Sequence, residues 1–161
     1  MSLFQSLDIS GSGLTAERLR MDLIANNIAN VNTTRTGNTT ASGNQIPYQR
    51  EVPEFESRTL PFQTLLNEQM QGGQLQSSGD GVEVSAIVND PAPFKEVYDP
   101  SSPDAIKVAE PGLQPGYVRT PNVEMVNEMV DMISASRAYE ANVTAINAGK
   151  SLVQKALTIG Q

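Results

Sequence analysis

The 161-residue sequence contains no cysteine, no histidine and no tryptophan. A chain without cysteine can form neither a disulfide nor a thiolate-bound zinc site. A chain without histidine lacks the side chain that most often serves as a general base and as a transition-metal ligand. These absences weigh against an enzyme or a metalloprotein, so we expect no catalytic residues, no metal and no cofactor.

Positive charge is also in short supply. The chain has 18 acidic and 11 basic residues and a formal net charge of −7, which argues against binding to nucleic acid or to an anionic membrane surface. It has no apolar run of about 18 residues, the length of a membrane-spanning helix. Its first residues, MSLFQSLDISGSG, lack the basic start of a cleaved secretory signal. If the protein leaves the cytoplasm, we expect a route without signal cleavage.

Proline is missing from both ends of the chain. All ten prolines lie within residues 47–121, and eight of the twelve glycines lie within residues 37–116. Because proline breaks a helix interior, the sequence divides into an N-terminal helix over residues 1–32, a Pro/Gly-rich insert over 33–121 and a C-terminal helix over 122–161. The predicted fold class is mainly α with a β-rich insert.

The insert carries weaker signals. Residues 48–57 and 81–88 alternate as strands do, and residues 60–73 are typical of a short helix closed by glycine. Residues 89–121 contain too much proline for long regular structure. We expect a small irregular or β-rich middle module and an extended return arm.

Both ends of the chain carry apolar residues at alternating steps of four and three, the spacing of a coiled-coil seam. At the N-terminal end these residues are Leu7, Leu14, Met21, Ile24, Ile28 and Val31. At the C-terminal end they are Met125, Met129, Met132, Val143, Ile146, Val153 and Leu157. The spacing predicts that the two long helices pair as a coiled-coil-like hairpin.

The helix boundaries have candidate caps. Two glycines interrupt the first helical pattern, and Ser10 or Ser12 could cap a restart of the helix at Leu14. Asn122 is the expected N-cap of the second helix.

The helix sides opposite the seams are not typical of solvent-facing surface. They carry apolar or small residues, namely Leu19, Leu23, Val130, Ala141, Ala145, Ala148 and Leu152. A lone surface helix would place lysine and glutamate there. Since one chain has only two long helices, we expect other chains to cover these faces. We also expect both ends to be largely disordered before assembly, because neither helix can bury enough surface alone.

Four asparagines, Asn26, Asn27, Asn30 and Asn32, stand close together near the end of the first helix. An amide buried between helices can donate and accept hydrogen bonds without the cost of a buried charge, and it fixes helix register. The alternative is that Asn30 and Asn32 end a helix and open a loop. We favour a helix interface for the first three and the loop for Asn32.

Two motifs at opposite ends of the chain carry a resemblance to a known family. LIANNIANVNTTRT near the N-terminus, paired with PNVEMVNEMVDMISASRAYEANVTAINAGKSLVQKALTIGQ at the C-terminus, resembles the flagellar basal-body rod proteins. SSPDA followed by PGYVRTPNV is similar in particular to the proximal-rod members of that family. The residues that match these motifs are Asn26, Asn27, Asn30, Asn32, Ser136, Arg137, Tyr139, Glu140, Ala141 and Asn142.

The resemblance implies a structural subunit of the bacterial flagellum and not an enzyme. In this family the terminal helices pack as a hairpin and stack on neighbouring subunits to form the rod, which is both drive shaft and export channel. The implied partners are copies of the chain, other rod proteins, the membrane-ring and export-gate junction at the rod base, and the type III export apparatus. Nucleic acid and small-molecule substrates are not implied. The implied location is the basal body, across the periplasm and cell-wall space, reached without a cleaved signal peptide.

Several alternatives stay open at this point. Arg137 could pair with Glu140 on the same helix or with a group on an adjacent subunit. The whole chain could be a soluble coiled-coil adaptor that does not polymerise, although that function leaves the apolar opposite faces unexplained. An enzyme built on two carboxylates ranks last, because the acidic residues are scattered over turns and helix flanks.

Overall fold

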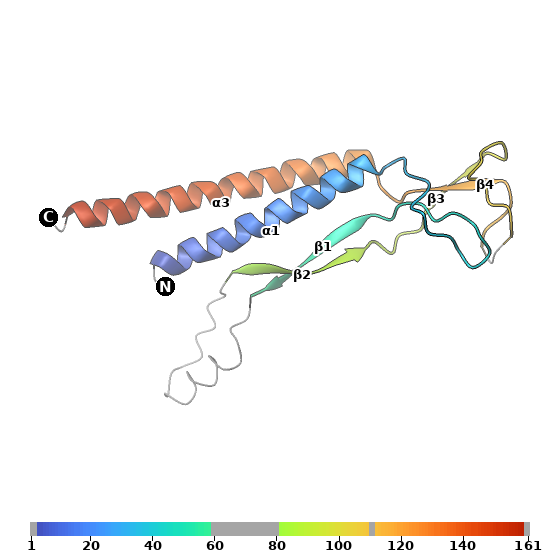
Figure 1. Cartoon of the computed structure of the whole chain (residues 1–161). Helices are drawn as coiled ribbons and strands as arrows, with labels where there is room; N and C mark the ends of the chain where they lie inside the picture. Colours follow the sequence, from blue (N-terminus) through green and yellow to red (C-terminus); the bar gives the residue numbers. More distant parts are fainter. Residues whose placement is uncertain (1–2, 59–80, 110–111, 160–161) are drawn as a thin grey trace, which may run out of the picture. The chain divides into compact units, whose positions relative to one another are not determined.

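A computed structural model describes residues 3–58, 81–109 and 112–159 (Figure 1). The elements follow one another as α1 (Leu3–Ala29), β1 (Glu51–Ser57), β2 (Val82–Asn89), β3 (Lys95–Tyr98), β4 (Tyr117–Thr120) and α3 (Met125–Ile159). The chain is thus mainly helical, with two small two-stranded sheets in its middle. The short helix expected at residues 60–73 lies outside the described residues. Neither described helix has an apolar stretch long enough to cross a membrane.

The chain forms two compact units, each assembled from segments distant in sequence. Unit one comprises Met1–Met21, Pro53–Ala86 and Ser134–Gln161. Unit two comprises Asp22–Val52 and Ile87–Ile133. Each unit therefore takes part of both helices and part of the insert. The division of the chain at residues 32 and 121 stays a prediction.

Helix α1 runs unbroken for 27 residues through both of its glycines. The hydroxyl of Ser10 donates to the carbonyl of Ser6 at 2.9 Å, and the hydroxyl of Ser12 donates to the carbonyl of Ile9 at 2.7 Å. Both side chains bond backward along the helix, so neither caps a new start. The predicted restart at Leu14 was wrong.

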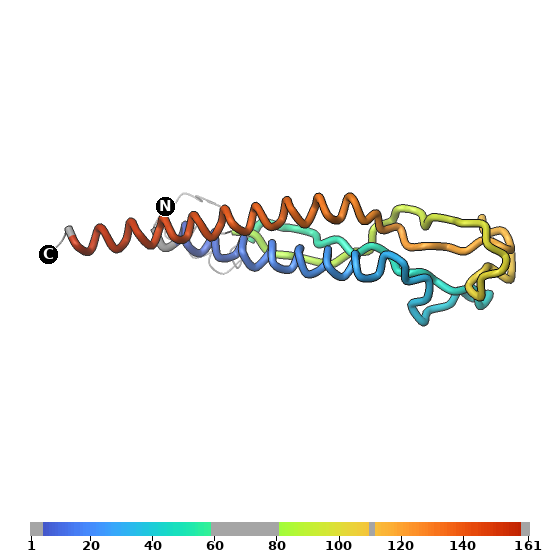
Figure 2. Tube along the Cα trace, turned by 90° about the horizontal axis from the view of Figure 1, so that it is seen from above, coloured from blue at the N-terminus to red at the C-terminus, as the bar shows by residue number. Residues whose placement is uncertain are grey.

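Glycines in unit one mark where α1 and α3 approach closely. A Cβ atom at Gly13 would lie 2.9 Å from Nδ2 of Asn142, and one at Gly149 would lie 2.9 Å from Cδ2 of Leu7. The parts of the two helices in this unit run side by side in both views (Figure 1, Figure 2). As the α1 residue number rises from 7 to 13 the α3 number falls from 149 to 142, so the contacts run in antiparallel order.

The inward side of α3 is offset from the predicted seam. Its inward residues recur every seven positions and are polar or small: Glu128 in unit two, then Ala135, Asn142 and Gly149 in unit one. This row begins between the predicted seam residues Met125 and Met129.

The offset leaves three predicted seam residues unburied. Met125 and Met129 are exposed, and Leu157 is 69% exposed. Their predicted burial within one chain was wrong, because the inward position beside Met125 and Met129 is taken by Glu128, which bonds to Asn27. For Leu157 the reason is different, since it lies beyond the part of α3 that α1 is long enough to meet.

The apolar cores of the two units differ in size. Unit two buries large side chains from several elements, namely Leu23, Ile24, Ile106, Val118 and Val123. Among the described residues of unit one, the buried apolar side chains are Ala16 and Ala135. Burial of apolar surface is the main favourable term in folding, so unit one gains little from its own described residues.

The two sheets are antiparallel pairs. In the first, the backbone N–H of Arg58 donates to the carbonyl of Gly81 at one end, and that of Asp90 donates to the carbonyl of Arg50 at the other. In the second, β3 pairs with β4 in a register that places Tyr98 opposite Tyr117. Residues 89–121 therefore contain a paired hairpin in addition to extended chain, which the proline content had not predicted.

Helix α3 begins at Met125, three residues after the expected cap. Oδ1 of Asn122 instead accepts from the backbone N–H of Arg50 at 2.8 Å, and its Nδ2 donates to the carbonyls of Asp90 and Ala92, both at 3.1 Å. The predicted N-cap was wrong, because this amide joins three segments of unit two.

Gly116 lies close to Tyr98 at the end of the second sheet. It has a φ of +89°, and a Cβ atom there would lie 3.1 Å from Cε2 of Tyr98. Gly43 has a similar φ of +83° with no atom within 4 Å. We expect Gly43→Ala to cost about 1 kcal/mol of unfolding free energy from backbone strain alone. Gly116→Ala should cost more, because Tyr98 must also move.

The measurement is urea unfolding of the two variants beside the original chain. Equal losses of stability would contradict the contact between residue 116 and the Tyr98 ring.

Candidate functional site

Asn27 is the buried member of the run of four asparagines. Its side chain is 1% exposed and uses its full hydrogen-bonding capacity within unit two. Oδ1 accepts from the hydroxyl of Tyr48 at 2.8 Å and from the backbone N–H of Glu51 at 3.0 Å. Nδ2 donates to the carbonyl of Glu51 at 2.9 Å and to Oε2 of Glu128 at 3.1 Å. Asparagine offers two donors and two acceptors, and all four are satisfied.

The other asparagines of the run have different surroundings. Nδ2 of Asn26 donates to the Tyr48 hydroxyl at 3.3 Å, and Nδ2 of Asn30 donates to the carbonyl of Asn26 at 3.0 Å. Asn32 lies beyond the helix and is exposed. Because Asn27 is buried within its own chain, it is not available to a neighbouring subunit, while Asn26 remains accessible.

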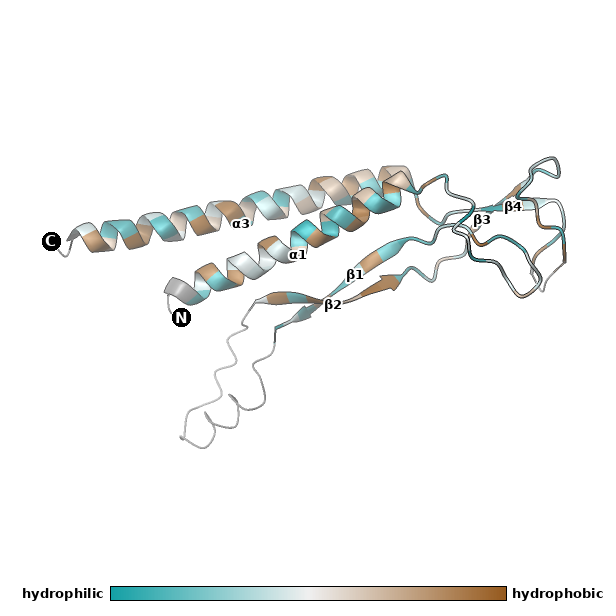
Figure 3. Ribbon diagram, viewed as in Figure 1, coloured by the Kyte–Doolittle hydropathy of each residue, from teal (hydrophilic) through white to brown (hydrophobic). Residues whose placement is uncertain are grey.

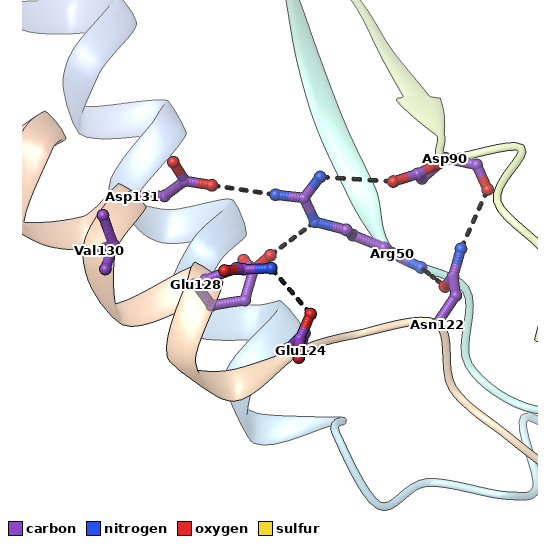
Figure 4. Close-up of a pocket in the computed structure, with 8 residues that line it drawn as sticks. Arg50, Asp90, Asn122, Glu124, Glu128, Val130 and Asp131 are labelled. Atoms are coloured by element: carbon purple, nitrogen blue, oxygen red, sulfur yellow. Dashed lines mark hydrogen bonds and ion pairs between the residues drawn. The ribbon is translucent and has the colours of Figure 1, made fainter. Parts of the chain in front are cut away.

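Glu128 and Arg50 form the charged part of the same cluster (Figure 4). The Glu128 side chain is 0% exposed. Its Oε1 accepts from Nε of Arg50 at 2.5 Å. The two terminal nitrogens of Arg50 reach Asp131 at 3.1 Å and Asp90 at 3.4 Å. One guanidinium thus links α3 to the segment after β2, beside a polar pocket of about 390 Å³.

The cluster shifts two pKa values. Burial tends to lower the pKa of Arg50, but its hydrogen bonds and ion pairs, first with Glu128, raise that pKa above its ordinary value. Burial, assisted by the charges of Glu51 and Glu128, raises the pKa of Tyr48 to about 12. Tyr48 is therefore a neutral hydroxyl donor near neutral pH, as its bond to Asn27 requires.

Sequence reasoning missed Arg50 and Glu128. The three members of the cluster, residues 27, 50 and 128, come from three distant segments, and periodicity within a helix gives no information about such contacts. One signal was available, a glutamate between the predicted seam residues Met125 and Met129. A charge on a helix side that is otherwise apolar needs a partner if it is buried.

A second polar contact ties two loops of unit two together. Asp104 accepts from the hydroxyl of Thr34 at 2.8 Å and pairs with Arg35. These donors, the Thr34 hydroxyl first, hold the pKa of Asp104 below its ordinary value. The loop that follows α1 is thereby anchored to the SSPDA segment.

The C-terminal motif lies on α3 within unit one. Asn142 lies against Gly13, and Ser136 and Tyr139 are partly buried. Arg137 and Glu140 are both exposed, and within the described part of the chain no ion pair joins them. Their charged groups remain accessible to a partner.

Helix α3 carries several exposed large apolar side chains, and hydrophobic segments recur along its ribbon (Figure 3). In unit two the exposed residues are Met125, Val126, Met129, Val130 and Ile133. In unit one Leu152 is 58% exposed and Leu157 is 69% exposed. Ala141, Ala145 and Ala148 are exposed as well. Groups of exposed large apolar side chains, such as the one at residues 125–133, are typical of protein–protein contact surfaces.

The apolar residues on the opposite face of α1, in contrast to those on α3, are not exposed. Leu23 is buried in the core of unit two and Leu19 is partly buried in unit one. Among the described residues of the two helices, the exposed large apolar side chains therefore lie on α3.

Comparison with known proteins agrees with this arrangement of motifs. The model of the family described as flagella basal body rod protein matches residues 7–35. The model described as flagellar basal body rod FlgEFG protein C-terminal matches residues 114–159. Both matches describe one class of protein, the flagellar basal-body rod proteins.

Full-length relatives make the class more specific. The flagellar basal-body rod protein FlgC of Bacillus subtilis is 46% identical over 161 residues, covering all of both chains. FlgC of Borreliella burgdorferi is 46% identical over 167 residues, and FlgC of Escherichia coli O6:H1 is 35% identical over 161 residues. These cover all of this chain, with 99% and 100% of the relative. The chain belongs to the FlgC family of flagellar basal-body rod proteins.

Glu128→Gln tests the buried charge pair. Removing one charge leaves Arg50 less compensated, and breaking a buried pair of this kind costs about 3–5 kcal/mol. Asp131→Asn is the matched control, because Asp131 contacts the same guanidinium but its side chain is 37% exposed. We expect the control to lose no more than about 1 kcal/mol.

Urea unfolding at neutral pH measures both variants. A Glu128→Gln protein as stable as the Asp131→Asn protein would contradict the assignment of Glu128 as the buried anchor of the cluster.

Proposed function

We propose that the chain is a structural subunit of the proximal rod and polymerises through its terminal helices to form the axial drive shaft and export channel. Family membership supports the rod and basal-body assignment. The observation that supports polymerisation is the exposed apolar surface of α3 beside a unit whose described core holds only two alanines. Covering that surface requires other chains.

The proposed hairpin of α1 and α3 is supported by the antiparallel order of their contacts. Leu7 meets Gly149 and Gly13 meets Asn142 in unit one, and Asn27 bonds to Glu128 in unit two. In this proposal the inward row on α3 replaces the seam inferred from Met125 and Met129.

The exposed motif residues are proposed to face neighbouring subunits. On α1 and the loop after it these are Asn26 and Asn32, joined by the partly buried Asn30. On α3 they are the motif residues Arg137, Glu140 and Ala141, joined by Ala145, Ala148 and Leu152 of the opposite face. The partly buried Ser136, Tyr139 and Asn142 are proposed to support the hairpin from within.

The proposed partners are copies of this chain and other rod proteins, with the membrane-ring and export-gate junction at the rod base. We propose export by the type III apparatus without a cleaved signal peptide, to a position spanning the periplasm and cell wall. The supporting fact is family membership.

Ala145→Glu tests burial of α3 between subunits. Ala145 is exposed in the single chain, so the variant should stay soluble with unchanged helix content by circular dichroism. In a subunit interface the charge would be buried without a partner, so we expect the variant to be absent from isolated basal bodies and the cells to be non-motile.

Asn147→Glu is the matched control, two residues away on a different side of the same helix and also exposed. It should incorporate. Normal incorporation of the Ala145→Glu protein would contradict burial of this face in the rod.

A further inference from the structure

Unit one contains a pocket of about 570 Å³, and none of its lining residues belongs to the polar cluster of unit two. Its walls come from Ile9, Ala16 and Glu17 on α1, Phe55 on β1, Val82 on β2 and Asn142 on α3. Most of these side chains are apolar, and Phe55 is itself exposed. The pocket is therefore a largely apolar recess with a carboxylate in its wall.

That carboxylate is incompletely satisfied. Oε2 of Glu17 is buried, and among the described residues no donor forms a hydrogen bond with it. Nη1 of Arg20 forms an ion pair with this oxygen at 3.8 Å, a distance too long for a hydrogen bond. A buried acceptor without a donor is costly, so the pocket calls for an occupant with a cationic head and an apolar stem.

The same unit carries a surface of that composition near the end of α3. Lys155 is exposed three residues after Leu152, so both side chains lie on one side of the helix. That side continues the exposed row formed by Ala145 and Ala148. Lys150 is also exposed, but it lies roughly 200° around the helix from Leu152.

Lys155 cannot fill the pocket of its own chain. Contacts of Leu7 with Gly149 and of Gly13 with Asn142 place Glu17 opposite the first turns of α3 in this unit. Lys155 lies farther along α3 by more than a dozen residues, which at 1.5 Å per residue is roughly 25 Å. The lysine must come from another molecule.

We propose that the pocket around Glu17 receives the Leu152–Lys155 edge of α3 from a second copy of this chain. The ammonium of Lys155 pairs with the carboxylate of Glu17, and Leu152 covers Phe55 and Val82. The two surfaces differ, so each copy can offer both and the contact can repeat from copy to copy. The proposal rests on the proposed function, because it requires copies that meet in the rod.

Carbodiimide cross-linking of isolated basal bodies tests this contact. The reagent joins a carboxylate and an amine in direct contact as an amide, and the water lost in that condensation converts the carbodiimide into a urea. We expect mass spectrometry to find a peptide linking residues 17 and 155. In rods assembled from light and heavy isotope-labelled chains, mixed-label peptides should show that the link joins two copies.

Two conservative variants serve as the matched pair. Lys155→Arg keeps the charge, so it should incorporate normally but lose the cross-link, since a guanidinium does not couple. Lys150→Arg should leave the cross-link unchanged. Exchange of charges gives a second test: Glu17→Lys and Lys155→Glu should each reduce incorporation, and the double variant should restore it. Glu17→Lys combined with Lys150→Glu should not.

The outcomes separate this proposal from the proposed function. Absence of the chain from basal bodies would refute both. A chain that incorporates but gives neither the cross-link nor rescue by charge exchange overturns the pocket contact alone. A cross-link from Glu17 to a lysine of a different rod protein overturns the second copy as the occupant.

Discussion

A chain with two long helices can cover only one side of each helix with the other. In unit one the close contacts at Gly13 and Gly149 use that single side for small residues, so few large apolar groups are buried there. The remaining apolar side chains of α3 stay exposed. The proposed function accounts for this small core, because neighbouring rod subunits would cover the exposed side chains.

Unit two has a larger apolar core than the described part of unit one. It buries Leu23, Ile24, Val118 and Val123 and adds a polar cluster in which Asn27, Arg50 and Glu128 hold three distant segments together. A satisfied buried amide contributes specificity of register more than bulk stability. We infer that this cluster fixes the positions of α1 and α3 within the unit, while the exposed surface of α3 remains for assembly.

Sequence reasoning recovered the parts of the structure that depend on local pattern. The two helices, both strands of the first sheet and the family motifs follow from periodicity and residue type along the chain. It missed the phase of the helix contact because it ranked the apolar Met125 and Met129 above the charged Glu128 as inward residues. It missed Arg50 and Glu128, and read Asn122 as a cap, because these side chains bond to segments far away in sequence, which one sequence does not reveal.

Hydrogen exchange of the dilute purified chain, read by mass spectrometry, tests the central claim most directly. The claim is that part of each helix is stable within one chain and the rest needs neighbours. We predict slow exchange at residues 22–29 and 125–133, next to the Asn27–Glu128 cluster, and fast exchange at residues 3–21 and 134–159. Equally strong protection along both helices would contradict the claim, because it would mean that unit one is stable without any other subunit.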